Sequence, residues 1–227
     1  MTRLALFDLD GTLIPGDSDH AFGAFMVQLG WVDADAHQRA NDAFYAQYQA
    51  GTLDIDAYVA FTTGAWRARP LADQAAARAR FLAEVMQPQL LPPAFALLRQ
   101  HQQAGDLVAI VTATNEFVTR PIADAFGVPH LLAVRLQRDA QGRATGRIDG
   151  VPSFRAGKID RVQQWLSGLG FSAGNPLADF EASTFYSDST NDLPLLELVS
   201  DPVATNPSPA LEAIALQRGW RILRLFP

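Results

Sequence analysis

The stretch that decides the fold is LALFDLDGTL at residues 4–13, an apolar run that ends in two carboxylates, a glycine and a hydroxyl. The apolar residues before position 8 predict a strand that is buried on both faces. Side chains two apart in a strand share a face, so Asp8 and Asp10 are expected to project together, about 6–7 Å apart along the chain. Gly11 allows a sharp turn directly after them. Two like charges placed there repel each other, which predicts a divalent cation between them.

Length and composition limit the class of protein. At 227 residues, the chain is long enough for one sizeable core or for a core domain with a smaller insertion. A formal net charge of −6, with Lys and Arg scattered, argues against nucleic acid as a partner. The absence of cysteine excludes a disulfide framework, a thiolate nucleophile and Cys-ligated zinc. No secretory signal and no membrane span is predicted, so we expect a cytoplasmic protein with no membrane partner.

Helical periodicity dominates the segment after the opening strand. Residues 15–86 have apolar positions at helical spacing and no clear strand, and they predict a compact insert of about four helices. The prolines between residues 88 and 93 mark the return to the main domain. Residues 87–227 then alternate helix and strand, which predicts a Rossmann-like α/β/α core of three layers around a mostly parallel sheet. We therefore expect a catalytic core made of 1–14 and 87–227, and a helical cap made of 15–86.

Polar side chains follow three of the expected strands. Asp8 and Asp10 end the first strand, Thr112 follows the strand 107–111, and Asp188 follows the strand 182–186. In open α/β sheets, ligands bind outside the carboxyl ends of strands, so these groups are expected to meet there. The remaining expected elements are helices near 94–104, 116–126, 157–169, 193–199 and 209–218, a hairpin around 139–142, and short strands at 202–204 and 220–225.

Four ordered motifs resemble those of the haloacid dehalogenase superfamily of phosphohydrolases and cover nearly the whole chain. They are DLDGTL at 8–13, Thr112, Lys158, and DSTND at 188–192. Each motif alone is weak evidence, and an Asp-Gly pair such as Asp10-Gly11 is commonly only a turn. The resemblance rests on all four motifs together, on their order and on their placement at strand ends. The helical insert after the first motif is similar to the cap of the subfamily IB branch, which contains phosphoserine phosphatase.

The resemblance implies a phosphatase that works through an aspartyl phosphate. Asp8 would attack phosphorus, and Asp10 would protonate the leaving alcohol and then deprotonate the hydrolytic water. Thr112 would donate its hydroxyl to a phosphoryl oxygen, and Lys158 would act as a fixed cation. An aspartate at position 10 favours phosphatase over dehalogenase chemistry, because halide displacement needs no protonated leaving group.

The resemblance also implies Mg²⁺ as the cofactor. The expected ligands are the Asp8 and Asp188 carboxylates and the Asp10 backbone carbonyl, all of them hard oxygens. Asp192 is expected to hold metal-bound water or Lys158 rather than the metal itself. Asn191 is expected next to Asp192, either near the metal without ligating it or as a helix cap.

Substrate choice is expected to lie in the cap and beside the second motif. The expected contacts are Asp17, Asp19, His20, Ala113 and Asn115. Asp17 is shorter than the glutamate that phosphoserine phosphatases present to the substrate amine, and Thr112-Ala113-Thr114 replaces their Ser-Gly-Gly. The stretches DSDH at 17–20 and TATN at 112–115 resemble a bacterial subgroup with histidinol-phosphate phosphatases. Histidinol phosphate and phosphoserine are thus the expected small phosphorylated metabolites.

Several alternatives stay open at this point. A phosphotransferase or mutase would use the same intermediate, and a non-catalytic protein would keep only the fold. His20 has an equal claim to an ordinary surface role, and Arg155 is expected to be a solvated loop residue rather than a phosphate ligand. The aromatic residues of the insert are expected to form helical core rather than a substrate site; they are Phe22, Phe25, Phe44 and Tyr48. A monomer and a homodimer are both compatible with the sequence.

Overall fold

The structure is a computed structural model that describes residues 2–172 and 174–226. Within these residues, one parallel sheet has the strand order β3-β2-β1-β6-β7-β8. The strands are β1 (Leu4–Phe7), β2 (Leu107–Asn115), β3 (His130–Val134), β6 (Ser183–Ser187), β7 (Asp201–Thr205) and β8 (Arg221–Leu223). In the centre of the sheet, Phe7 pairs with Ile110 on one side and Tyr186 on the other. Asp8 therefore leaves the sheet at its middle.

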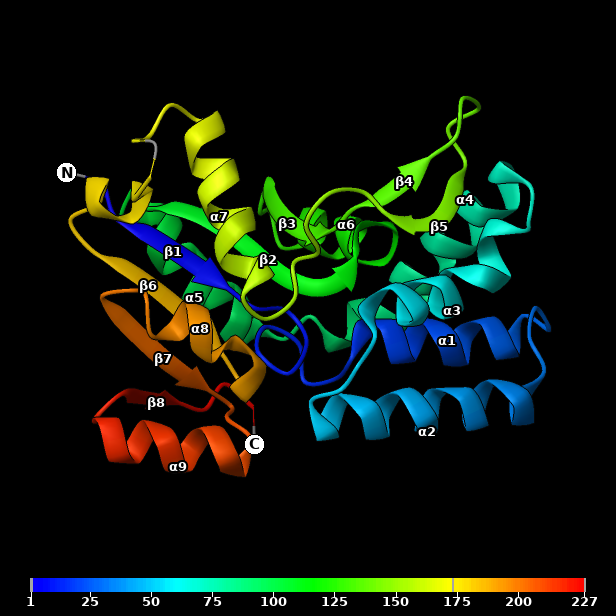
Figure 1. The fold of residues 1–227 in the computed structure, drawn as a ribbon, viewed down its shortest axis with the longest axis horizontal. Coiled ribbons are helices and arrows are strands. Elements are labelled where there is room, and N and C mark those ends of the chain that lie inside the picture. The colour runs from blue at the N-terminus through cyan, green and yellow to red at the C-terminus, as the bar shows by residue number, and fades with distance from the viewer. Residues whose placement is uncertain (1, 173, 227) are drawn as a thin grey trace.

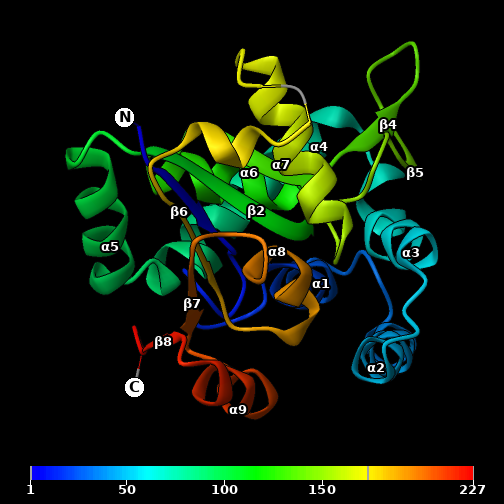
Figure 2. The same ribbon diagram turned by 60° about the vertical axis from the view of Figure 1, so that its left-hand side comes forward.

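Alternate residues of β1 divide between two apolar clusters, one on each face of the sheet. Leu4 and Leu6 pack with α7 (Gly157–Gly168), α8 (Leu193–Leu196) and α9 (Pro209–Arg218). Ala5 and Phe7 pack with α5 (Pro92–Gln103) and α6 (Glu116–Ala125). Figures 1 and 2 show these helices as layers on either side of the strands. The predicted three-layer α/β/α core is confirmed.

Four helices between β1 and α5 gather beyond the carboxyl ends of the strands, on the right of Figure 1. They are α1 (Ser18–Gln28), α2 (Ala34–Ala50), α3 (Ile55–Arg67) and α4 (Leu71–Phe81), followed by a π-helical turn at Leu82–Met86 and a 3₁₀ turn at Gln87–Gln89. Carboxylates of Asp17, Asp33 and Asp54 accept backbone N–H bonds at the beginnings of the first three helices. Gly51 ends α2 with a left-handed φ of 74°.

Aromatic packing joins these four helices to the sheet layer. The Trp66 ring of α3 stacks on Phe117 of α6 with centroids 3.9 Å apart, and Phe22 of α1 meets Phe117 edge-on. Phe22 and Phe25 are buried, as expected of helical core residues. A separate antiparallel hairpin, β4 (Leu136–Arg138) and β5 (Ala144–Ile148), lies against α3, where the Arg67 guanidinium donates to the Thr145 carbonyl. The helical segment therefore shares one apolar cluster with the sheet.

Two elements differ from the sequence-based expectation. Strand β2 continues to Asn115, which pairs with Val134, and its register shifts between Val111 and Asn115. Such a bulge changes the direction of side chains, and here it contains Thr112 and Thr114. Helix α8 ends at Leu196 rather than near 199, and beyond this end the N–H groups of Leu198 and Val199 share the Leu195 carbonyl. Among the described residues, every helix is too short or too polar to cross a membrane.

The start of α7 gives a stability prediction. A Cβ at Gly157 would lie 2.2 Å from the Pro152 carbonyl oxygen, so Gly157→Ala is expected to lower the free energy of unfolding by about 1–3 kcal/mol. The control is Gly168→Ala in the same helix, where a Cβ meets nothing within 4 Å. There the gain in helix propensity is expected to leave stability unchanged or raise it by up to about 1 kcal/mol. Urea unfolding of both variants tests this, and equal effects would contradict the steric argument.

Candidate active site

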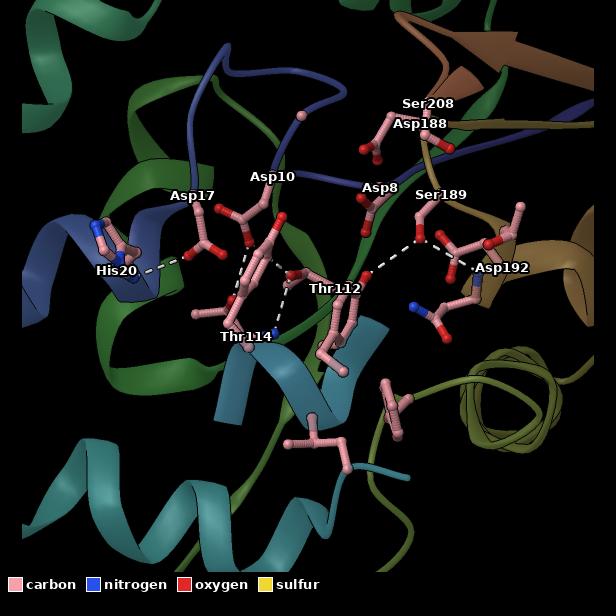
Figure 3. A pocket seen from close by; sticks show the side chains of 18 of the residues that line it. Asp8, Asp10, Asp17, His20, Thr112, Thr114, Asp188, Ser189, Asp192 and Ser208 are labelled. Atoms are coloured by element: carbon pink, nitrogen blue, oxygen red, sulfur yellow. Dashed lines mark hydrogen bonds between the residues drawn. The ribbon is translucent and has the colours of Figure 1, made fainter. Parts of the chain in front are cut away.

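A cavity of about 1030 Å³ lies at the carboxyl ends of β1, β2 and β6, between the sheet and the helices α1–α3. Ten of the twelve side chains predicted for the site line it, and most are labelled in Figure 3. They are Asp8, Asp10, Asp17, His20, Thr112, Ala113, Lys158, Asp188, Asn191 and Asp192. The fold thus brings together segments as far apart in sequence as those that carry Asp8 and Asp192.

A buried lysine holds the floor of the cavity together. The Lys158 Nζ lies 2.8 Å from Asp8 Oδ1 and 2.7 Å from Asp192 Oδ2, and only 2% of this lysine is exposed. The Ser187 hydroxyl also donates to Asp192 Oδ2, at 2.7 Å. Burial alone would lower the pKa of Lys158, but the Asp192 and Asp8 carboxylates outweigh it and raise the pKa. Lys158 is therefore a charged donor aimed at Asp8.

The acidic groups around Asp8 exceed the positive charge that one lysine supplies. Burial raises the pKa of Asp8 well above its usual range, and the charges of Asp192 and Asp188 add to this rise. Burial and the Asp192 charge likewise raise the pKa of Asp188 to about 7. Gly11, with a φ of 74°, makes room for the second carboxylate, because a Cβ there would lie 2.5 Å from Asp188 Oδ2. A cation beside both carboxylates would favour their ionised forms.

The donor atoms suit Mg²⁺. In the described part of the chain, no three His, Cys, Asp or Glu side chains form a metal-binding group by themselves. A cation beside Asp8 and Asp188 would have two carboxylates, with the Asp10 carbonyl as a third protein oxygen. Mg²⁺ commonly takes one or two carboxylates and completes its octahedron with water and substrate phosphate, whereas Zn²⁺ in proteins is usually held by three or four side chains.

Asp10 is held by hydrogen bonds from two directions. The Ser18 N–H at the beginning of α1 donates to Oδ1 at 2.6 Å, and the Thr114 hydroxyl donates to Oδ2 at 2.9 Å. The Thr112 hydroxyl is more distant from Oδ2, at 3.4 Å, and accepts from the Thr114 N–H. Burial, reinforced by the Asp17 charge, raises the pKa of Asp10 to about 6. This carboxyl group can therefore exchange a proton near neutral pH.

Asp17 and His20 line the cavity on the side of α1. Asp17 begins this helix, and its Oδ1 accepts from the backbone N–H groups of Asp19 and His20, each at 2.9 Å. The His20 side chain is exposed and takes a 2.9 Å hydrogen bond from the Asn41 amide of α2 at its Nδ1. Both remain available on the surface that a bound molecule would meet.

Asp19 and Asn115, expected at the substrate, lie behind the cavity wall instead. They are buried, and the Asn115 Nδ2 donates to Asp19 Oδ1 at 3.3 Å. Asn115 is occupied in addition as the cap of α6, where its Oδ1 accepts from the Phe117 and Val118 N–H groups. Asn115 ends β2 and begins α6, so its side chain bonds to the helix backbone, which explains the difference for this residue.

The loop after β6 differs in its details from the expectation. Ser189, not Asn191, is the cap of the 3₁₀ turn Thr190–Asp192, because its Oγ accepts from the Asn191 N–H at 3.2 Å. The Asn191 Oδ1 accepts instead from the Arg155 Nε at 3.0 Å. Tyr48 of α2 reaches this loop with its hydroxyl 3.1 Å from Ser189 Oγ. Tyr48 and Phe44 line the cavity, while Phe44 also packs against the Tyr58 and Phe61 rings of α3, as expected of a helical core residue.

Sequence reasoning missed residues that hold the loop after Asp8 and the loop after β6. The Asn206 Nδ2 donates to the carbonyls of Gly11 and Thr12 at 3.0 and 3.2 Å, and Ser208 N–H donates to the Asp188 carbonyl at 2.9 Å. Asn206 directly follows β7, so the rule that polar residues after parallel strands belong to the site would have identified it. Thr114 carried a similar signal, since it lies two residues after Thr112.

The buried Asp19 carboxyl group gives a pH prediction. Burial, with a further effect from Asp17, raises the pKa of Asp19 to about 7, so the folded chain keeps a proton that the unfolded chain releases near pH 4. The free energy of unfolding of the wild type is therefore expected to fall, relative to Asp19→Asn, as pH rises from about 4 to about 7, by at most about 4 kcal/mol. Urea titrations in EDTA measure it. The control is Asp35→Asn, the exposed acid in the first turn of α2, and an identical pH slope for both variants would contradict this assignment.

Comparisons with known proteins agree with this geometry. A family model described as haloacid dehalogenase-like hydrolase matches residues 5–197. A histidinol-phosphatase of Neisseria meningitidis serogroup C is 41% identical over 223 residues, which cover 98% of this chain and 99% of the relative. The phosphoserine phosphatase SerB1 of Mycobacterium tuberculosis is 28% identical over 98% of this chain and 70% of its own length.

Solved structures share the fold over the whole chain. A Bordetella pertussis Tohama I protein of unknown function is 48% identical, with a TM-score of 0.92 and complete coverage of both chains. A substrate-bound phosphoserine phosphatase is 15% identical, with a TM-score of 0.65 over 98% of this chain and 93% of that structure, and shows the common fold alone. The family match over residues 5–197, with the 41% identity to a relative of the same length, shows that the chain belongs to the haloacid dehalogenase-like hydrolases.

Proposed function

We propose that the chain is a Mg²⁺-dependent phosphomonoesterase that hydrolyses a small phosphorylated metabolite through an aspartyl phosphate on Asp8. The observation that carries this proposal is the Asp8 carboxylate at the base of the cavity. It ends the central strand, is fixed by Lys158 at 2.8 Å and stands next to the charge of Asp188. Structural carboxylates are seldom gathered in this way, because their repulsion is costly unless a cation and a phosphoryl group share the site.

In the first step, an Asp8 oxygen attacks phosphorus, the bond from phosphorus to the ester oxygen breaks, and Asp10 gives its proton to the leaving oxygen. In the second step, Asp10 takes a proton from water, the water oxygen attacks phosphorus, and the bond from phosphorus to Asp8 breaks. Lys158 and the Thr112 hydroxyl stabilise the charge on the phosphoryl oxygens. Mg²⁺ bound by Asp8, Asp188 and the Asp10 carbonyl would supply the remaining charge neutralisation.

The charge distribution in the cavity indicates the class of leaving group. Asp17 and Asp42 line its outer part, and Lys158 is the only lysine or arginine in the described lining. Since Lys158 is already held by two carboxylates, a carboxylate on the leaving group would lack a cationic partner. A leaving group with an amine or an imidazole instead matches the acidic wall.

We therefore assign the substrate to phosphate esters of the histidinol phosphate type rather than to phosphoserine, which carries a carboxylate. The 41% identical relative is named a histidinol-phosphatase, in agreement with this choice. Both hydrogen bonds to Asp17 end on its Oδ1, and we assign its Oδ2 to the substrate's cation. In this proposal, residues 15–86 form a cap over the leaving group, while 1–14 and 87–227 hold the phosphoryl group.

Replacement of the nucleophile tests the reaction. Asp8→Asn is expected to lower the release of inorganic phosphate by at least about 10³-fold, because an amide is a poor nucleophile, while the melting temperature stays near that of the wild type. EDTA is expected to abolish turnover and added Mg²⁺ to restore it. Phosphate release is measured together with transfer to an alcohol, which would reveal a phosphotransferase. Appreciable turnover by Asp8→Asn, or turnover unaffected by EDTA, would contradict the mechanism.

The leaving-group assignment has a separate test. Asp17→Asn keeps the cap of α1, because asparagine is an equally good capping residue, but removes the charge. We expect kcat/KM for histidinol phosphate to fall about 10- to 100-fold, or ~1.4–2.8 kcal/mol. The uncharged leaving group of p-nitrophenyl phosphate serves as the control, for which the change should stay below about threefold. A wild type that prefers phosphoserine to histidinol phosphate would overturn the assignment.

A further inference from the structure

Two contacts join the C-terminal end of α2 to the loop after β6, across the cavity. The first runs through Arg155, whose Nη1 donates to the Gly51 carbonyl at 2.9 Å and whose Nε donates to Asn191 Oδ1 at 3.0 Å. The second is the hydrogen bond between the Tyr48 hydroxyl and Ser189 Oγ at 3.1 Å. The partners are far apart in sequence: 104 residues for Arg155 and Gly51, and 141 for Tyr48 and Ser189. Only the tertiary fold brings them together.

Arg155 is placed for this contact and not for binding phosphate. Its guanidinium lies 4.9 Å from the centre of the Phe154 ring, which lines the cavity, while Arg155 itself is outside the described lining. The backbone of Arg155 has a φ of 51°, which is uncommon for a residue other than glycine. Gly51 closes α2 in a left-handed conformation, so its carbonyl lies at the negative end of the helix, where a cationic donor is favoured.

Tyr48 lies above the reacting groups. It is about one turn before Gly51 on α2 and lines the cavity. Asp8 and Asp188 line the same cavity as Tyr48, and their charges add to the rise in the pKa of Tyr48 that burial causes. Its partner Ser189 stands between Asp188 and the turn that ends in Asp192. Both contacts therefore end on the loop that supplies one carboxylate for the cation and another for Lys158.

We propose that Arg155 and Tyr48 are positioning residues that latch α2 onto the Asp188–Asp192 loop and close the phosphoryl end of the cavity. The proposal rests on the function proposed above. With the latch closed, the aspartyl phosphate meets only the water next to Asp10. With the latch open, an added alcohol competes with that water: its oxygen bonds to phosphorus, its proton passes to Asp10, and the bond from phosphorus to Asp8 breaks.

Three variants of the full-length chain test the latch with p-nitrophenyl phosphate and Mg²⁺ in the presence of methanol. Arg155→Met and Tyr48→Phe are expected to raise the ratio of methyl phosphate to inorganic phosphate at least about threefold, and KM by about three- to tenfold, with kcat changed less than about twofold. The matched control is Arg39→Met, which removes the same charge from an exposed position of α2. A purely structural role would lower the active fraction and kcat without changing the product ratio.

Hydrogen exchange supplies a readout that needs no activity. Peptides covering 44–53 and 188–192 are expected to exchange at least about tenfold faster in Arg155→Met and Tyr48→Phe than in the wild type, with β1 and β6 unchanged. If Arg155→Met fails to fold, Tyr48→Phe decides, because it keeps the ring and loses one hydroxyl. Product ratios and exchange rates equal to those of Arg39→Met would overturn the latch. A wild type without turnover but with these exchange differences would overturn the proposed function and keep the latch.

Discussion

The site depends on one buried cation, Lys158, shared between Asp8 and Asp192. A lysine that is 2% exposed is tolerated only because two carboxylates lie within hydrogen-bonding distance, and removal of one partner from a buried ion pair typically costs about 3–5 kcal/mol. The three residues come from the central strand, the beginning of α7 and the turn after β6. The pairing thus requires that strand, helix and turn are all in place, which couples the folding of the core to the assembly of the reactive groups.

The surplus of negative charge around this lysine explains the rest of the site. Burial and the charges of neighbouring carboxylates raise the pKa of Asp8, Asp10 and Asp188, so their surroundings disfavour the ionised forms of these three acids. In the proposed function, a divalent cation would relieve the repulsion between Asp8 and Asp188, and a cationic leaving group would relieve it near Asp17. Both proposed ligands would offset the same excess of negative charge in the cavity. A phosphate ester without a positive charge would meet an unfavourable potential at the entrance.

Much of this organisation was predictable from the sequence. Local sequence patterns predicted the sheet and its layers. They are the apolar run before Asp8, the helical periodicity after it, and the alternation of helices and strands beyond residue 87. The four motifs located the cavity because strand ends converge in a parallel sheet. Thr114 and Asn206 were missed although they follow expected strands in the same way, and the contact between Tyr48 and Ser189 could not be predicted because its partners are 141 residues apart. Asp19 and Asn115 were expected to contact the substrate but are buried outside the cavity lining, since a residue's place in a motif does not tell whether its side chain bonds to other protein groups or faces a ligand.

The stack of Trp66 on Phe117 has a consequence for exchanging substrate preference between relatives. Its rings, 3.9 Å apart, belong to two segments that a graft of residues 15–86 would separate, since Trp66 travels with the insert and Phe117 stays behind. A chimaera that imports a foreign insert without a matching indole would leave a void against α6, next to the bulged strand that carries Thr112 and Thr114. The void would allow the strand that carries Thr112 and Thr114 to shift. A chimaera that exchanges the insert should therefore exchange Trp66 and Phe117 together.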